Sequence, residues 1–134
     1  MEISKENYLR AMYEFFEKTE NKTEIKAIDL SKILNISKSG ISQMLKKLKK
    51  DKLILFAPYS PIKFTEKGFE KAERITKNYR IIVVFLREKL KLNEKEILFE
   101  SHKLEHAFSD DVIKKLDLFL DKPKFCFDGK KIPR

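Results

Sequence analysis

Residues 29–55, which read DLSKILNISKSGISQMLKKLKKDKLIL, constrain the fold of this chain more than any other stretch. Their first part carries apolar residues at the i, i+3 and i+4 spacing that marks one face of a helix, namely Leu30, Ile33 and Leu34. A turn at Asn35 and Ile36 follows. Ser37 then stands where an N-cap side chain accepts a backbone N–H group of the next helix. The pattern predicts a helix-turn-helix unit.

The second helix of this unit divides into two faces. Its apolar face holds Ile41, Met44, Leu45 and Leu48. Hydroxyl, amide and ammonium groups occupy its start and its other side, on Ser37, Lys38, Ser39, Ser42, Gln43 and Lys46. Hydroxyls and an amide near a helix N-terminus can reach base edges in a major groove, while lysines meet phosphates. We therefore expect this helix to bind double-stranded DNA; the alternative is an ordinary helix with a solvated basic face.

Two short apolar runs follow, residues 53–56 and 62–64, joined by the connector APYSP. The two prolines of the connector exclude a helix, so the runs predict a β-hairpin. A hairpin placed directly after a helix-turn-helix unit forms the wing of a winged helix. The tip carries no lysine or arginine, so contact with the DNA backbone must come from Tyr59, Ser60 or the nearby Lys63. Of these we predict Tyr59 as a DNA-binding residue.

The rest of the chain predicts helices only. Thr65 caps a long helix over about residues 66–90, and the second half of that helix is apolar on nearly all sides, so another element must cover it. Two shorter capped helices follow, one ending near Ala107 and one beginning after Ser109. The last helix is expected to turn four residues inward: Ile113, Leu116, Phe119 and Leu120. A pair of apolar helices attached to a DNA-binding unit is typical of a dimerisation domain.

The net charge of +9 is distributed unevenly along the chain. Residues 1–93 carry 21 Lys and Arg against 12 Asp and Glu, whereas residues 94–121 carry 4 against 8. The basic front indicates an acidic partner such as nucleic acid, and the acidic segment indicates a second task. One cysteine cannot form an internal disulfide, and neither a signal peptide nor a membrane-spanning run is evident. We expect a cytoplasmic protein with no membrane partner.

Both histidines of the chain lie in one stretch, where His102 and His106 flank Glu105. Positions i, i+3 and i+4 share one face of a helix, so two imidazoles and a carboxylate can converge on one cation. These ligand types suit a borderline divalent transition metal. A further ligand must come from elsewhere, and Asn7, Cys126 and water are the candidates. The alternative is an exposed polar turn whose histidines are incidental.

The same letters, HKLEH, match the H-x-x-E-H pattern of inverted-motif zinc peptidases, in which the glutamate is the general base. That chemistry requires a further acidic ligand downstream and a substrate cleft. Only 28 residues follow His106, and the front of the chain predicts a DNA-binding unit. We therefore predict no enzyme and no small-molecule substrate.

Together these patterns predict a mainly α protein with two domains. Residues 1–70 are expected to form a winged helix-turn-helix DNA-binding domain, and the long helix over about 66–90 links it onward. Residues 71–134 are expected to form an all-helical dimerisation and metal-binding domain.

Five segments taken in order resemble the diphtheria-toxin-repressor type of metal-dependent transcription regulators. They are ENYLRAMYE, ISKSGISQMLKKLKKDKLI, FTEKG, ESHKLEHAFSDDV and CFDGKKIP. The resemblance covers nearly the whole chain, and it depends on the joint order because each segment alone is weakly specific. We expect a chain of the short, two-domain manganese type, because no segment of the sequence matches the SH3-like domain of the longer iron-type members.

The resemblance implies a homodimer that binds a palindromic operator when Fe(II) or Mn(II) is bound, with Zn(II) as a third candidate. Such a protein represses genes of metal uptake or homeostasis. Three residues match the family's DNA-contacting helix: Ser37, Ser39 and Gln43. The family's metal ligands are matched by His102, Glu105 and His106, and more weakly by Asn7. A cation shared by Asn7 and the 102–106 turn would tie the first helix to the dimerisation domain and fix the spacing of two recognition helices.

The chain also departs from the family pattern. Tyr79 stands where a histidine ligand is usual, and Val83 and Leu98 replace two ligands of the iron-type second site. We therefore expect one metal site per subunit. Two alternatives remain open, a metal-independent winged-helix regulator and a non-specific basic DNA-binding protein.

Overall fold

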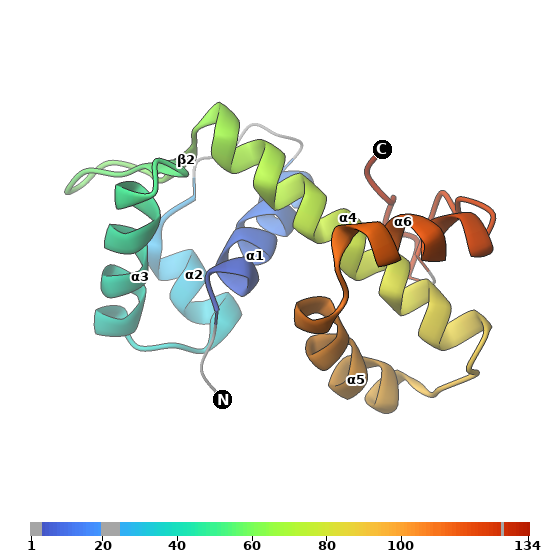
Figure 1. The fold of residues 1–134 in the computed structure, drawn as a ribbon. Helices are drawn as coiled ribbons and strands as arrows, with labels where there is room; N and C mark the ends of the chain where they lie inside the picture. Colours follow the sequence, from blue (N-terminus) through green and yellow to red (C-terminus); the bar gives the residue numbers. More distant parts are fainter. Residues whose placement is uncertain (1–3, 20–24, 127) are drawn as a thin grey trace. The chain divides into compact units, whose positions relative to one another are not determined.

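A computed structural model describes residues 4–19, 25–126 and 128–134, and it divides into two compact units, residues 1–75 and 76–134. Within the described residues the helices and strands follow in this order (Figure 1): α1 (Lys5–Lys18), α2 (Ala27–Leu34), α3 (Lys38–Lys50), β1 (Ile54–Leu55), β2 (Lys63–Phe64), α4 (Glu66–Glu88), α5 (Glu94–Ala107) and α6 (Asp110–Phe119). The predicted mainly α fold is confirmed. The two units meet within α4, and the functional division at residue 70 stays a prediction.

The first unit encloses one apolar core between its helices and its hairpin. The core includes Tyr8, Leu9, Met12, Leu30, Ile41, Leu45, Leu48, Leu53, Ile54 and Ile62. The inward face predicted for α3 is confirmed, since Ile41, Leu45 and Leu48 are at most 1% exposed. In α2 the prediction that Ile33 faces the core is wrong, because Ile33 is 51% exposed. Leu30 is the one buried residue of this short helix.

The turn between α2 and α3 is fixed by local hydrogen bonds. Asn35 ends α2 with φ +53°, in the left-handed region that asparagine tolerates better than most residues. The Ser31 hydroxyl donates to the carbonyl oxygen of Ile36 at 2.6 Å. The Ser37 oxygen then accepts the N–H of Gly40 at 3.2 Å, as the predicted N-cap requires. The sequence therefore sets the direction in which α3 leaves the turn.

The predicted hairpin is present directly after α3. Strands β1 and β2 are antiparallel, with Ile54 opposite Phe64. An isolated bridge between Ile25 and Ile62 ties the hairpin to the chain before α2. The Thr65 oxygen accepts an N–H in the first turn of α4 and caps that helix, as predicted. Helices α1 to α3 and this hairpin make the first unit a winged helix.

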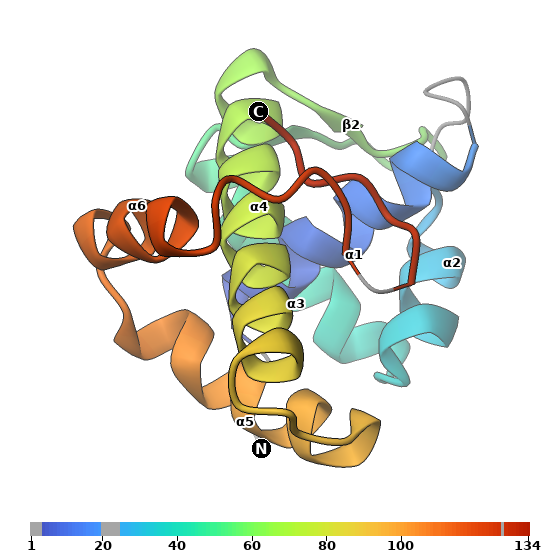
Figure 2. The same ribbon diagram turned by 90° about the vertical axis from the view of Figure 1, so that its right-hand side faces the viewer.

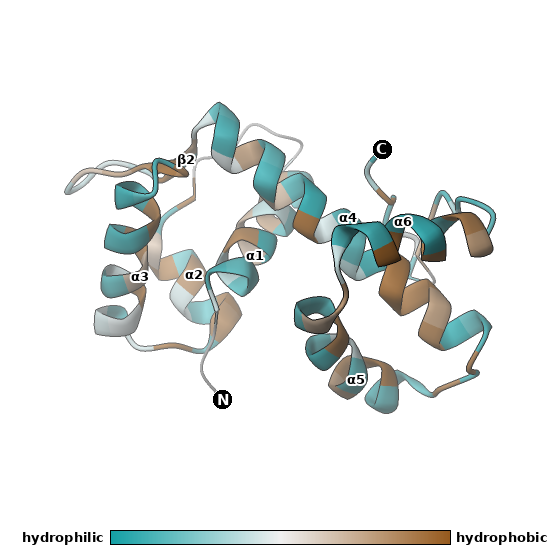
Figure 3. Cartoon of the chain, viewed as in Figure 1, coloured by the Kyte–Doolittle hydropathy of each residue, from teal (hydrophilic) through white to brown (hydrophobic). Residues whose placement is uncertain are grey.

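The second unit is built around the apolar second half of α4. Figures 1 and 2 show α5, α6 and the described residues of the tail, 121–126 and 128–134, around it, and Figure 3 colours much of this part of α4 as hydrophobic. The buried core holds Ile81, Ile82, Val83, Val84, Leu86, Ile97, Ile113, Leu120, Cys126 and Ile132. The expectation that another element covers this stretch is confirmed, since residues of α5, α6 and the tail share its core. Cys126 belongs to the core, where its Sγ donates to the Arg80 carbonyl oxygen at 3.6 Å.

The inward face of α6 differs from the prediction in one place. Phe119 is 63% exposed, whereas Asp117 is only 7% exposed. Asp117 and Leu120 follow Ile113 at the i+4 and i+7 positions of one helix face, and Phe119 lies one residue off that face. The buried carboxylate is bound by Arg134, whose Nη1 lies 2.5 Å from Oδ2 of Asp117. An ion pair with the tail therefore occupies the place predicted for an aromatic ring.

Candidate functional site

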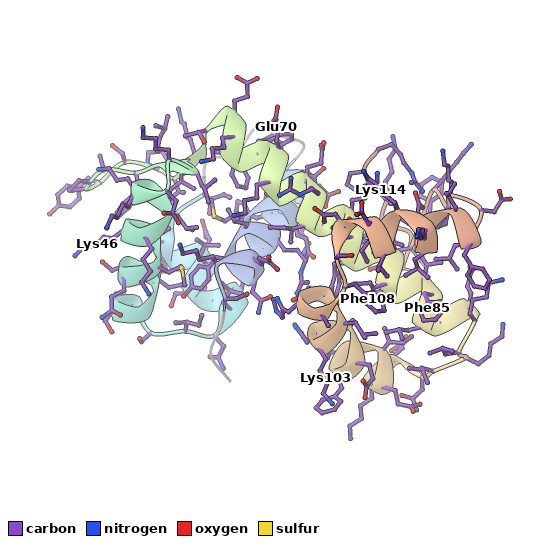
Figure 4. All side chains as sticks on the ribbon, viewed as in Figure 1. Lys46, Glu70, Phe85, Lys103, Phe108 and Lys114 are labelled. Atoms are coloured by element: carbon purple, nitrogen blue, oxygen red, sulfur yellow. The ribbon has the colours of Figure 1, made fainter. Side chains whose placement is uncertain are left out.

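Helix α3 presents to solvent the polar face that the sequence predicts. Five of the six predicted DNA-binding residues of this region are exposed and Ser42 is half-buried; the five are Ser37, Lys38, Ser39, Gln43 and Lys46. Figure 3 shows the outer side of α3 as hydrophilic, and Figure 4 shows Lys46 projecting from it. Because the apolar side of α3 is held in the core, these groups are fixed in an outward orientation.

The beginning of α3 suits an anion. Free backbone N–H groups and the helix dipole favour negative charge at a helix N-terminus. The hydroxyl oxygens of Ser37 and Ser39 lie 3.2 Å apart at this end, beside the capping bond from Gly40. A phosphate or a base edge placed there meets several donors at once.

The far end of α3 is strongly basic. Its exposed cations are Lys46, Lys47, Lys49, Lys50 and, just beyond the helix, Lys52. Asp51 is the one carboxylate among residues 38–52, and Lys5 from α1 binds it, with Nζ 2.5 Å from Oδ2. The hydrogen bond from Lys5 is the largest cause that lowers the pKa of Asp51 below its ordinary value. Lys5 thus balances the one negative charge at this end of α3.

A hollow of about 700 Å³ lies between the end of α3 and the wing. Its apolar lining consists of Ile54, Leu55, Phe56, Ala57 and Pro61. Lys49, Lys52 and Lys63 also line it, and no acidic residue does. Tyr59 is fully exposed near the wing tip with φ +64°. The sequence pointed to Tyr59 but missed Lys49 and Lys52 as neighbours of the wing, because no periodic pattern reports how a hairpin folds back.

Helix α5 holds the three predicted metal ligands on one turn. Oε1 of Glu105 lies 3.8 Å from Nδ1 of His102 and 3.2 Å from Nε2 of His106. The Glu105 side chain is 4% exposed, against 28% for His102 and 43% for His106. The structure thus brings the two imidazoles to the same carboxylate oxygen, as the i, i+3, i+4 spacing predicts.

These residues fit a divalent cation by two observations. Nδ1 of His102 is buried and has no hydrogen-bond partner among the described residues, so a ligand would satisfy it. Metal–ligand bonds of roughly 2.1 Å place neighbouring ligand atoms about 3.0–3.5 Å apart; the 3.2 Å separation from His106 lies in this range, and the 3.8 Å separation from His102 is longer. Within the described ranges, no group of three His, Cys, Asp or Glu stands close enough together to hold a metal ion, so these side chains would have to move to enclose one.

Asn7, the predicted additional ligand, lies in α1 of the first unit. Its Oδ1 is buried without a hydrogen-bond partner in the described part of the chain. Ser4 caps the helix just before it, and the Ser4 oxygen accepts the Asn7 N–H at 3.4 Å. Cys126, the other candidate, belongs to no metal-binding group in the residues described. The role of Asn7 stays a prediction.

Two family descriptions match the chain, one for each unit's part of the sequence. Residues 2–62 match the N-terminal DNA binding domain of iron dependent repressors. Residues 65–134 match the metal binding and dimerisation domain of iron dependent repressors. The chain belongs to the iron-dependent repressor family. Its members are metal-dependent transcriptional regulators of the diphtheria-toxin-repressor type, so the family suggested by the five sequence segments is confirmed.

Individual relatives agree with this assignment. The uncharacterised HTH-type transcriptional regulator MJ0568 of Methanocaldococcus jannaschii is 41% identical over 92% of this chain and 98% of its own length. Among solved structures, the manganese regulator SloR is 34% identical with a TM-score of 0.85, over 100% of this chain and 61% of SloR. ScaR with bound Zn²⁺ is 30% identical with a TM-score of 0.82, over 98% of this chain and 60% of ScaR. The chain thus spans about three fifths of these two solved relatives.

The family also decides between two kinds of chemistry for the HKLEH segment. The relatives of this chain are transcriptional regulators, so the peptidase alternative finds no support among them. Within the described residues, no helix is long and apolar enough to cross a membrane.

Proposed function

We propose that this iron-dependent repressor family member is a metal-responsive repressor that binds a palindromic DNA operator as a homodimer. One observation carries the proposal. The stripe of Ser39, Gln43 and Lys46 on α3 is exposed, in a chain whose α5 also holds two imidazoles against one carboxylate.

In this proposal the polar side chains near the start of α3 recognise the bases. The Gln43 amide can both donate to and accept from an adenine in the major groove, and the hydroxyls of Ser39 and Ser42 suit several bases. Lys46 and the basic end of α3 bind phosphates, and the lysine-lined hollow under the wing takes up the neighbouring backbone. Tyr59 extends this contact at the wing tip. A dimer repeats the whole set roughly one helical turn of DNA away, about 34 Å.

The second unit supplies the partner surface of the dimer. Several large apolar side chains of this unit are exposed: Leu90, Leu98, Phe99, Val112, Leu118, Phe119 and Phe125. Exposed apolar side chains that gather into one patch mark a surface of association, and these residues are the candidates for such a patch. The second unit also lies within residues 65–134, which match the family's metal binding and dimerisation domain. We therefore place the homodimer contact in this unit.

One divalent cation per subunit is proposed at His102, Glu105 and His106. Imidazole and carboxylate ligands suit Fe(II) and Mn(II), and Zn(II) is a third candidate. SloR is a manganese regulator and ScaR holds Zn²⁺, in keeping with this range. When bound, the cation supplies the positive charge that keeps both imidazoles and the carboxylate in one shell. The protein has a DNA-competent form and another form, and metal favours the first only if it binds that form more tightly. The size of the shift is limited by the difference in metal affinity between the two forms.

The test is operator binding measured by fluorescence anisotropy. DNA selected from a random library in the presence of Mn(II) provides the probe, which is then titrated with Mn(II), anaerobic Fe(II) and Zn(II), with and without chelator. His106→Ala should abolish metal stimulation, and sedimentation should show that the dimer remains. Lys103→Ala, an exposed change on the same helix, should retain stimulation. Asn7→Ala tests the predicted extra ligand in the same assay.

Three outcomes would contradict the proposal. Binding that survives chelation would indicate a metal-independent regulator. Equal displacement by unrelated competitor DNA would indicate a non-specific basic protein. If metal stimulates operator binding by His106→Ala as strongly as by the unchanged protein, the proposed metal site on α5 is wrong.

A further inference from the structure

Tyr79 of α4 and His102 of α5 lie side by side in the second unit. Their ring centroids are 6.4 Å apart and their planes make an angle of 49°. Aromatic pairs attract one another at centroid distances of about 4.5–7 Å, so this is a genuine ring contact. Both residues belong to the same compact unit, and the contact is therefore internal to it.

A second contact joins Tyr79 to the residue before His102. Ser101 is fully buried, and its Oγ donates to the Tyr79 hydroxyl at 3.4 Å and to the Leu98 carbonyl oxygen at 3.2 Å. A serine hydroxyl has a single proton, so it serves these two acceptors alternately. Tyr79 thus contacts α5 twice: its ring lies against His102, and its hydroxyl oxygen accepts the hydrogen bond from Ser101.

The contact with Tyr79 bears on the orientation of His102. Nδ1 of His102 is turned toward Glu105 at 3.8 Å, yet it is buried and makes no hydrogen bond among the described residues. No such bond therefore explains why the imidazole adopts this rotamer. The neighbouring phenol ring does, because a ring tilted against the imidazole at this distance restricts its rotation.

We propose that Tyr79 is the positioning residue of the metal centre, and that its ring holds the His102 imidazole with Nδ1 toward Glu105. The inference rests on the proposed function, because it takes His102, Glu105 and His106 as the ligands of one cation. Tyr79 itself does not have to touch the cation. Its role is to restrict His102 before binding, so that less side-chain entropy is lost when the ligands close.

The expected effect is on metal affinity. Loss of a group that orients a ligand typically lowers metal affinity about 10- to 100-fold. Tyr79→Leu removes the ring and should fall within this range. Tyr79→Phe keeps the ring and loses only the hydroxyl, so it should bind nearly as well as the unchanged protein.

Co(II) titration of the full chain provides the measurement, because its visible absorption reports both affinity and coordination. The matched control is Phe85→Leu, which removes a half-buried ring from the same helix about 9 Å further along. Phe85→Leu should lower thermal stability about as much as Tyr79→Leu while leaving Co(II) affinity unchanged. If Tyr79→Leu does not fold, Tyr79→Met fills a similar volume without a ring.

A metal-free readout tests the contact itself. The chain has two histidines, so their ring protons are readily resolved by NMR and assigned with His106→Ala. The His102 signals should shift in Tyr79→Leu, because the neighbouring ring current is lost, and they should stay in place in Phe85→Leu.

The possible results distinguish failure of the role proposed for Tyr79 from failure of the proposed metal centre. Co(II) binding by the unchanged protein, lost in His106→Ala, together with undiminished affinity in Tyr79→Leu, would overturn the role of Tyr79 alone. An affinity loss no larger than that of Phe85→Leu would do the same. Failure of the unchanged protein to bind Co(II) would overturn the metal centre, and this inference with it.

Discussion

The backbone of Gly68, in the first turn of α4, lies directly against the carbonyl group of Leu53 at the start of the wing. A Cβ atom at position 68 would come well under 3.0 Å from the oxygen and the carbon of that carbonyl. Both are backbone atoms and cannot move aside without shifting the wing. We expect Gly68→Ala to lower the free energy of unfolding by at least about 2 kcal/mol, as overpacked sites do. Urea unfolding followed by circular dichroism measures the change.

Gly40→Ala is the matched control, since Gly40 holds the same third position in α3. A Cβ there meets side-chain atoms and no backbone, Ile36 Cγ2 at 2.8 Å and Ser37 Oγ at 3.3 Å, and a side chain can shift more easily than a backbone carbonyl. Alanine also favours a helix over glycine by about 1 kcal/mol. Gly40→Ala should therefore leave stability within about 1 kcal/mol of the unchanged protein. Equal losses in the two variants would show that the Leu53 carbonyl is not the cause.

The sequence predicts the helices of this protein well because their signals are local. Ser37, Thr65 and Asn93 each carry the oxygen that caps the following helix, and in each case the structure contains the bond. The apolar spacing of α3 likewise identifies its buried face without any knowledge of its neighbours. Where three or four adjacent residues determine an element, a single sequence suffices.

The rest depends on contacts between residues far apart in the chain. Asp117 is buried because Arg134 reaches it from the tail, and nothing in the spacing of α6 announces this partner. The Tyr79–His102 ring pair also joins two helices. The proposed ligand set on α5 could be predicted from one helical turn, whereas the neighbouring ring of Tyr79 could not.

Changes on α3 should separate base recognition from phosphate binding. Gln43→Ala should weaken binding to the selected operator by about 1–3 kcal/mol and leave unrelated DNA almost unaffected. Lys46→Ala should weaken binding to both and reduce the slope of log K against log salt by about 1. Anisotropy titrations at four salt concentrations measure both quantities. A Gln43→Ala effect of equal size on unrelated DNA would argue against base recognition by this residue.

The ion pair between Asp117 and Arg134 should stabilise the second unit. Arg134 also donates from Nη2 to the Pro123 carbonyl oxygen, so it fixes the tail at two points. Arg134→Ala leaves a buried carboxylate without this partner and should cost about 1–3 kcal/mol in urea unfolding. Lys130→Ala alters an exposed pair with Asp128 at 3.7 Å and should cost less than about 1 kcal/mol. If the two variants lose the same stability, the pair with Asp117 contributes no more than a surface contact.

The pair between Lys5 and Asp51 should make the stability of the protein depend on pH in the acid range. Lys5 lowers the pKa of Asp51 below its ordinary value of 3.8, so the folded state binds the Asp51 proton more weakly than the unfolded state does. The stabilisation is therefore present above pH 3.8 and is lost as the pH falls through the lower, folded-state pKa. Asp51→Asn should have a lower Tm than the unchanged protein at pH 7, and the difference should shrink in strong acid and in 1 M salt.

Glu100→Gln, which alters an exposed pair with Lys103 at 3.9 Å, should show almost no difference in Tm at pH 7 or in strong acid. Asp51 also caps the C-terminal end of α3, where the helix dipole disfavours a carboxylate, so a higher Tm for Asp51→Asn at pH 7 would mean that the dipole outweighs Lys5.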